Sequence, residues 1–128
     1  MSTYLVALAV GVWDASPPSA DGTPQTVYYP KTFPDGQAKA IFALDESVKV
    51  LNAFGSGAVF DSPFEDTGLT KLDSMGVSDF AAGAMENWGL VIYRTSRLLV
   101  DDEESSQAAL SGQILIIAHE LAHQWFGN

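Results

Sequence analysis

At 128 residues and 13.7 kDa, the chain has the length of one domain, and with 47% hydrophobic and 17% charged residues it is too apolar to be disordered. Sixteen acidic side chains against six basic ones give a formal net charge of -10, which argues against a nucleic-acid partner, because phosphate binding needs a basic surface. The chain has no cysteine, which excludes disulfides and zinc-thiolate sites.

The amino-terminal part of the chain is expected to form strands. Residues 4–13 are apolar and contain several β-branched side chains, which predicts a buried strand. No basic residue precedes this run and it is too short to span a bilayer, so neither a signal peptide nor a transmembrane segment is predicted. Ser, Pro, Gly and Asp predict a loop over residues 14–24, and a second strand is expected over residues 25–29.

The middle of the chain changes to a helical period. Apolar side chains recur at intervals of three and four over residues 37–54, which predicts an amphipathic helix that stops at Gly55. Residues 55–70 are rich in Gly, Ser, Asp and Pro, and a structureless loop of this length is unusual unless it is functional or disordered. Strands are predicted over residues 72–77 and 90–95.

The last helix carries the only two histidines of the chain. It is predicted to begin at Ser105 or Ser106, or else at Ser111, because serine is a favourable N-cap. His119 and His123 are four residues apart, so their rings project from one face of the helix, close enough to hold one metal ion. Zinc binds imidazole nitrogen and a catalytic zinc site uses three protein ligands, so this pair would supply two of them.

Glu120 follows the first histidine and completes the pattern H-E-x-x-H. A carboxylate at this position can accept the proton of a water that attacks a carbonyl, once zinc has lowered the pKa of that water. The alternative interpretation is structural, with two histidines that are simply packed and hydrogen-bonded in a core.

A second candidate site lies between the two last predicted strands. Glu86 is the only charged residue in the stretch from Gly83 to Gly89. Small residues there would let the backbone of a ligand approach closely, and a strand at a sheet edge offers free amides and carbonyls to an extended peptide. The alternative is that Glu86 is a solvated carboxylate at a strand end, beside glycines that serve the turns.

Together, the stretch Gly83-Ala84-Met85-Glu86-Asn87 and the later stretch from His119 to Asn128 resemble the zinc aminopeptidases of the aminopeptidase N and puromycin-sensitive type. Residues 1–7 are similar to the end of the amino-terminal β-domain of that family. The resemblance implies that residues 1–14 end that β-domain and that residues 15–128 form the amino-terminal part of a thermolysin-like catalytic domain. Its α+β fold would be a mixed sheet packed on the zinc helix, with the strand from Gly83 to Asn87 at the sheet edge.

The same resemblance implies a role for each residue of the two motifs. His119 and His123 would bind zinc, and Glu120 would be the general base. Glu86 would pair with the free α-amino group of a peptide substrate, so that one residue is removed from the amino terminus. The remaining residues expected to bind the substrate are Gly83, Ala84, Met85 and Asn87.

The sequence departs from the family pattern in one respect that concerns the metal. The third zinc ligand of the family is a glutamate on the helix that follows, and the sequence ends before that position. We therefore expect a fragment or a truncated product, which alone binds zinc weakly, is poorly stable and is nearly inactive. Two other functions stay open: a zinc endopeptidase on the same scaffold, and a non-catalytic peptide-binding module. The compartment is left open by the sequence.

Overall fold

Five strands form one mixed sheet in the part of the chain that the computed structural model describes, residues 3–101 and 105–127. The three central strands run parallel to one another, and the two edge strands are antiparallel to their neighbours. In spatial order, the strands are β1 (Trp13–Ala15), β2 (Val27–Pro30), β3 (Asp73–Val77), β5 (Leu90–Arg94) and β4 (Ala84–Met85). The strands predicted over residues 25–29, 72–77 and 90–95 are therefore confirmed, with small shifts at their ends.

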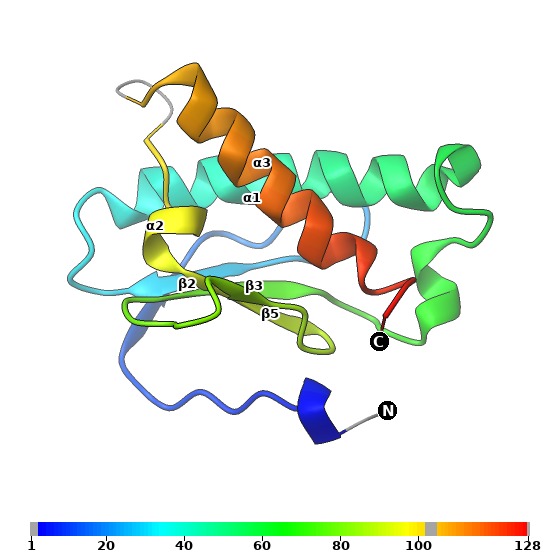
Figure 1. Ribbon diagram of the computed structural model, residues 1–128, viewed down its shortest axis with the longest axis horizontal. Helices are drawn as coiled ribbons and strands as arrows, with labels where there is room; N and C mark the ends of the chain where they lie inside the picture. Colours follow the sequence, from blue (N-terminus) through cyan, green and yellow to red (C-terminus); the bar gives the residue numbers. More distant parts are fainter. Residues whose placement is uncertain (1–2, 102–104, 128) are drawn as a thin grey trace.

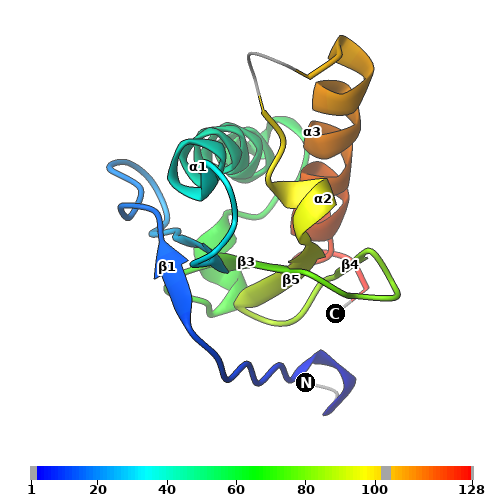
Figure 2. The ribbon, with the colours of Figure 1, turned by 90° about the vertical axis from the view of Figure 1, so that its left-hand side faces the viewer.

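Two long helices cover one face of this sheet, as the two ribbon views show (Figure 1, Figure 2). They are α1 (Gly36–Ala53) and α3 (Gln107–Ala122), and the single turn α2 (Thr95–Leu98) follows β5 directly. Helix α1 confirms the helix predicted over residues 37–54, and the α+β class is confirmed with it. None of the helices in the described ranges combines the length and the apolar character that crossing a membrane requires.

The hydrophobic core lies between the helices and the sheet. Because side chains alternate along a strand, Val91 and Tyr93 of β5 both face this layer and are fully buried. Helix α3 contributes Ile117 and Leu121, one turn apart. The other buried members of the cluster are Val27, Tyr29, Ala40, Ala43, Leu44, Leu51, Phe64, Leu72, Leu98 and Leu99.

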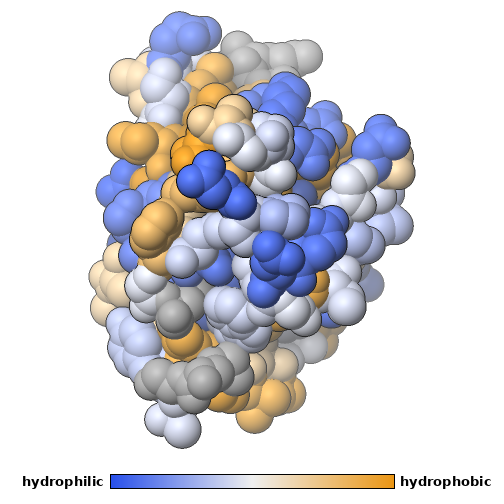
Figure 3. All heavy atoms as spheres, turned by 90° about the vertical axis from the view of Figure 1, so that its right-hand side faces the viewer, coloured by the Kyte–Doolittle hydropathy of each residue, from blue (hydrophilic) through white to orange (hydrophobic). Residues whose placement is uncertain are grey.

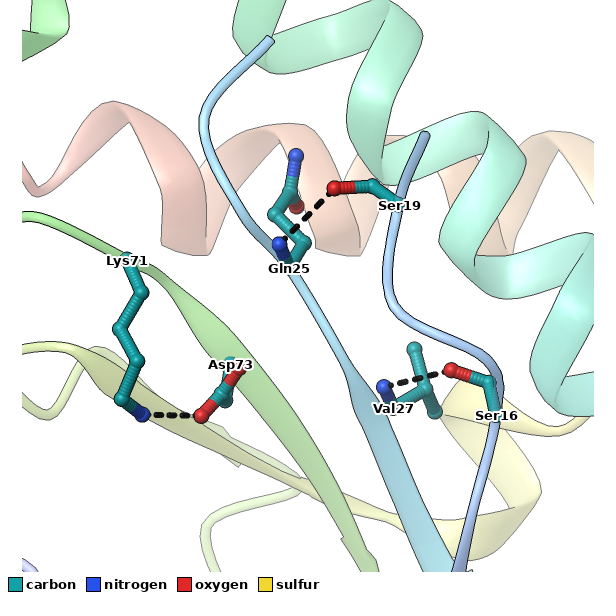
Figure 4. Close-up of polar contacts among 6 residues, drawn as sticks. All are labelled: Ser16, Ser19, Gln25, Val27, Lys71 and Asp73. Carbon is teal, nitrogen blue, oxygen red and sulfur yellow. Dashed lines mark hydrogen bonds and ion pairs between the residues drawn. The ribbon is translucent and has the colours of Figure 1, made fainter. Parts of the chain in front are cut away.

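Two serine hydroxyls in the loop after β1 accept main-chain N–H groups at the start of β2 and just before it (Figure 4). The main-chain N–H of Val27 donates to Ser16 Oγ at 3.0 Å, and the main-chain N–H of Gln25 donates to Ser19 Oγ at 3.0 Å. Ser47 of α1 then donates its hydroxyl proton to Gln25 Oε1 at 2.5 Å. The helix layer and the sheet are thus joined by buried polar contacts as well as by apolar packing.

The buried strand predicted over residues 4–13 is wrong. Residues Thr3–Leu5 form a 3₁₀ turn, and the following segment passes the sheet on the face opposite α1 and α3 without joining it (Figure 2). Leu5 is buried, but Leu8 and Val10 are 89% and 90% exposed. The apolar composition indicated burial, yet no layer of the described chain covers these side chains. The domain boundary expected after residue 14 stays a prediction.

The loop predicted over residues 55–70 contains two short helical turns. A wide, distorted turn spans Phe54–Ala58 and continues from α1, and a 3₁₀ turn spans Phe64–Thr67. Both lie at the end of the molecule where the described chain finishes, and on the surface there polar and apolar residues are intermixed (Figure 3). This segment also contacts the end of α3.

Candidate metal centre

Helix α3 begins at a serine cap and buries one face. The hydroxyl of Ser106 accepts a hydrogen bond from the main-chain N–H of Ala109 at 3.2 Å, so the first of the predicted start positions is the correct one. Gln113, Ile117 and Glu120 recur at intervals of four and three and are all buried. The histidines lie beside this buried face rather than within it.

The structure brings the two histidines together at the carboxyl end of α3. His119 is exposed, and His123 is half-buried at the position that caps the helix. Their Nε2 atoms lie 3.3 Å apart, and the two rings are nearly perpendicular, at 88°. The rings therefore converge through one nitrogen of each, as the spacing predicted, and they are not separated by core packing.

This geometry matches what a zinc ion requires of two ligands. Two nitrogens bound at about 2.0–2.1 Å to one tetrahedral ion lie about 3.3–3.4 Å apart. The observed separation of the Nε2 atoms, 3.3 Å, falls within that range. The residues present therefore fit a zinc ion that is shared by the two imidazoles.

Glu120 belongs to the buried face of α3, with only 6% of its surface exposed, and interacts electrostatically with both histidines. Burial raises the pKa of its carboxyl group, and the negative charge of Glu86 raises it further, whereas His119 and His123 oppose the shift. A carboxylate whose proton affinity is increased is better suited to accept a proton than an ordinary surface carboxylate is. The electrostatic interaction with Glu86 also shows that the acidic residues of the two motifs lie near each other.

The main chain at Glu86 is also linked to the end of α3. The side-chain amide of Gln124 approaches the main-chain carbonyl of Glu86 at 3.5 Å, which is at the long end of hydrogen-bond distances. Gln124 itself is buried. The segment that carries Glu86 thus packs directly against the helix that carries the histidines.

The residues before Glu86 form an edge of the sheet, although the strand is shorter than predicted. The prediction placed a strand over residues 83–87, whereas β4 contains only Ala84 and Met85, which pair with β5. Strand β4 is last in the sheet order, so in the described part of the chain no further strand pairs with its outer side. Gly83 has φ +86°, a conformation that favours glycine, and its carbonyl accepts the main-chain N–H of Arg94 at 2.8 Å.

Asn87 is placed differently from its neighbours. Its side chain is 5% exposed, and Oδ1 is buried without a hydrogen-bond partner among the described residues. The residues from Gly83 to Glu86 are half-buried. Asn87 is therefore the only buried residue among residues 83–87.

Three residues near the centre were not singled out from the sequence. Gln124 lies four residues after Glu120, in the turn that follows α3, and a continued helical spacing could have indicated it. Tyr93 is fully buried on β5 and interacts electrostatically with Glu120. Trp125 donates its Nε1 proton to the carbonyl of Ser62, a contact between distant segments that no local pattern indicates.

A third metal ligand does not lie beside the histidines in residues 3–101 or 105–127. Within these ranges, no group of three or more His, Cys, Asp or Glu side chains is arranged to hold a metal ion. The described chain therefore supplies two imidazoles and one nearby carboxylate to this centre.

Known proteins can be aligned with the whole length of this chain. The chain is 46% identical to Aminopeptidase M1-C of Oryza sativa subsp. japonica over 129 aligned residues, which cover all of the chain and 14% of that relative. It is 44% identical to Aminopeptidase M1 of Arabidopsis thaliana, again over all of the chain and 14% of the relative. It is 43% identical to Endoplasmic reticulum aminopeptidase 1 of Homo sapiens, of which it covers 13%.

The chain thus spans about one seventh of the length of these relatives. In addition, residues 42–128 match the peptidase family M1 domain, and this stretch includes both the Glu86 segment and the histidine helix. The resemblance inferred from these two motifs is confirmed, and the chain belongs to peptidase family M1.

Proposed function

We propose that this chain supplies the metal-binding helix and the substrate edge of a zinc-dependent aminopeptidase. The observation that supports this most directly is the 3.3 Å separation of the Nε2 atoms of His119 and His123, beside the buried carboxyl group of Glu120. The relatives that match the whole chain are named aminopeptidases. The substrate class would then be peptides with a free amino terminus.

In this proposal, the two acidic residues have separate tasks. Glu86 pairs with the cationic amino group of the substrate, while Ala84 and Met85 offer main-chain groups to an extended peptide at the β4 edge. Glu120 accepts a proton from the attacking water and returns it to the leaving amine. His119 and His123 would hold zinc, which when bound lowers the pKa of a water and polarises the substrate carbonyl.

Activity can be tested in a chimera, because the chain aligns over its whole length with a named aminopeptidase. The chain would replace the matching segment of rice Aminopeptidase M1-C, and turnover of an aminoacyl reporter would be measured with and without a chelator. We expect activity that the chelator removes. In the chimera, Glu120→Gln should lower kcat about 10²- to 10⁴-fold, because a general base is lost.

Glu65→Gln is the control, because Glu65 is an exposed glutamate on the 3₁₀ turn of the 55–70 segment. It should leave kcat unchanged. The proposed function would be contradicted by a chimera that has the same unfolding temperature as the rice enzyme and yet no turnover. Full turnover in the Glu120→Gln chimera would contradict it as well.

The same chimera separates an aminopeptidase from a zinc endopeptidase. If Glu86 binds the substrate amine, Glu86→Gln should raise KM strongly for peptides with a free amino terminus. An endopeptidase would instead cleave amino-blocked peptides and free peptides equally well, and Glu86→Gln would leave both unchanged.

A non-catalytic peptide-binding module is the second candidate, since the described residues hold two imidazoles and no third metal ligand. With two ligands, the 128-residue chain alone should bind zinc weakly and show little turnover. Calorimetric titration with zinc chloride distinguishes the two functions. Weak binding that disappears in His123→Gln supports the metal centre, whereas peptide binding without any zinc binding supports the module.

A further inference from the structure

The ring of His123 has a partner on the side away from His119. Its Nδ1 atom lies 2.8 Å from the main-chain carbonyl oxygen of Phe126. A carbonyl oxygen can only accept a hydrogen bond, so Nδ1 must carry the proton in this contact. The neutral ring then has its lone pair on Nε2, which is the atom that faces His119.

We propose that the main-chain carbonyl of Phe126 orients His123 as a metal ligand, and that Gly127 is a positioning residue because it makes room for the His123 ring in this contact. This inference rests on the proposed function, since it concerns how the second imidazole is prepared for the metal. A hydrogen bond to the far nitrogen of a histidine fixes both its tautomer and the direction of its lone pair.

The Phe126 carbonyl is itself held in place by the chain around it. The main-chain N–H groups of Trp125 and Phe126 both donate to the carbonyl of Ala122, at 3.0 and 3.1 Å, so the turn after α3 is closed. The ring of Phe60 stacks on Trp125 with centroids 5.0 Å apart and lies 5.2 Å from the ring of Phe126. The acceptor is therefore held by a turn and by aromatic contacts in addition to its contact with the histidine.

Gly127 has a specific steric reason to lack a side chain. Its φ is +98°, which side chains rarely adopt, and a Cβ atom there would lie 2.8 Å from His123 Nδ1 and 3.3 Å from Cε1. A methyl group would therefore push the imidazole ring away from the Phe126 carbonyl. The atoms it would displace belong to one of the two proposed ligands, so the effect should appear at the metal centre.

In the metal-free chain, the two histidines differ in which ring nitrogen carries the proton. The lone pair on His123 Nε2 accepts a hydrogen bond from His119 Nε2–H across the 3.3 Å that separates them. When a metal ion enters between these atoms, His123 can keep its proton on Nδ1, whereas His119 must release the proton from Nε2. His119 is exposed, so its Nδ1 atom can carry the proton instead and donate a hydrogen bond to water.

The first experiment needs no metal, and it uses a variant protein only to assign the signals. Long-range ¹⁵N–¹H correlation spectra of the imidazole groups, recorded at alkaline pH where imidazole is neutral, report which nitrogen carries the proton. His119→Gln assigns the signals. We expect the Nδ1–H tautomer for His123 and the Nε2–H tautomer for His119. An Nε2–H tautomer at His123 would overturn the proposal.

The second experiment compares two alanine variants at left-handed glycines. Gly127→Ala should remove the preference of His123 for the Nδ1–H tautomer and weaken the binding of zinc chloride about tenfold, as loss of an outer-shell partner does. Gly68→Ala is the matched control: its φ is +82° and a Cβ there meets nothing within 4 Å. It carries the same backbone strain but should leave the tautomer and the zinc affinity unchanged.

The outcomes separate this proposal from the proposed function. If Gly127→Ala keeps the tautomer and the zinc affinity of Gly68→Ala, the orienting role is wrong. If the parent chain shows the expected tautomers but binds no zinc, the metal centre is wrong, while the orientation of His123 by Phe126 stands. Should Gly127→Ala fail to fold, the tautomers of the parent chain still decide the question.

Discussion

The indole Nε1–H of Trp125 donates to the main-chain carbonyl of Ser62 at 2.8 Å, which joins the turn after α3 to the segment that follows α1. Phe54 and Phe64 both meet the indole ring edge-on, with centroids 6.0 and 5.8 Å away. These contacts make residues 54–64 a structural support for the helix end. Residues 54–64, which are rich in Gly and Ser, therefore support the turn that follows α3.

Replacing Trp125 by Phe should destabilise the chain. The aromatic contacts are mostly kept, but the bond to Ser62 is lost, so we expect a decrease of about 1–2 kcal/mol in the free energy of unfolding, measured with urea. Trp13→Phe is the matched control, because Trp13 Nε1 is buried with no hydrogen-bond partner in the described chain. Its loss should be smaller, or the change stabilising, because the unsatisfied donor disappears. Equal losses in the two variants would contradict this account.

Leu5 and Leu8 should respond oppositely to truncation, although they are the same residue in the same apolar segment. Leu5 is 3% exposed, so Leu5→Ala should lower the free energy of unfolding by about 2–5 kcal/mol. Leu8 is 89% exposed, so Leu8→Ala should change it by no more than about 0.5 kcal/mol. Urea unfolding of both variants tests the exposure of this segment. A large loss in Leu8→Ala would show that the side chain is covered in solution.

The sequence predicted the fold well where the pattern is local. The helical period of residues 37–54 and the apolar, strand-forming composition of residues 90–95 are local features, so α1 and the central strands were predicted to within two residues at each end. The segment over residues 4–13 was misassigned because its apolar composition does not reveal whether another layer covers it. The 90% exposure of Val10 is determined by the tertiary arrangement and not by the local sequence.

The candidate site, too, was predicted well where it depends on local geometry and less well where it depends on the tertiary arrangement. The proximity of His119 and His123 follows from helix geometry alone, because four residues are about one turn. The proximity of Glu86 to Glu120 depends on β4 pairing with β5 under α3, and only the family resemblance suggested it. The Phe126 carbonyl was not considered, because the sequence does not show which main-chain groups a turn will expose.

Ser106 and Ser111 were both possible starts for α3. Replacing each by alanine should change the stability of the chain in opposite directions. Ser106→Ala removes the cap on the N–H of Ala109, so it should cost about 1 kcal/mol of stability. Ser111 is exposed inside the helix, where Ala has the higher helix propensity, so Ser111→Ala should stabilise by a few tenths of a kcal/mol, about 0.5 at most. Thermal unfolding of the two variants at one pH measures the difference. A loss in Ser111→Ala without one in Ser106→Ala would place the start of the helix later.

Tyr93 should make the stability of the chain depend on pH at the alkaline end. The side chain is fully buried, and its hydroxyl makes no hydrogen bond of ordinary geometry in the described chain. Burial is the main cause that raises the pKa of this hydroxyl, and the negative charge of Glu120 raises it further, whereas Ser74 nearby opposes the shift. The folded chain therefore keeps the phenol proton at a pH at which an unfolded chain releases it.

The sign of the effect follows from proton binding in the two states. Below about pH 10 both states keep the Tyr93 proton, so this residue adds no pH dependence. Above it the folded state binds more protons, so the free energy of unfolding should fall by up to about 1.4 kcal/mol per pH unit. Urea unfolding across this range measures the slope, and Tyr93→Phe is the control, because it keeps the ring and removes the titrating group. If the slope is the same in both proteins, the Tyr93 hydroxyl titrates alike in the folded and unfolded states, and its burial beside Glu120 does not hold in solution.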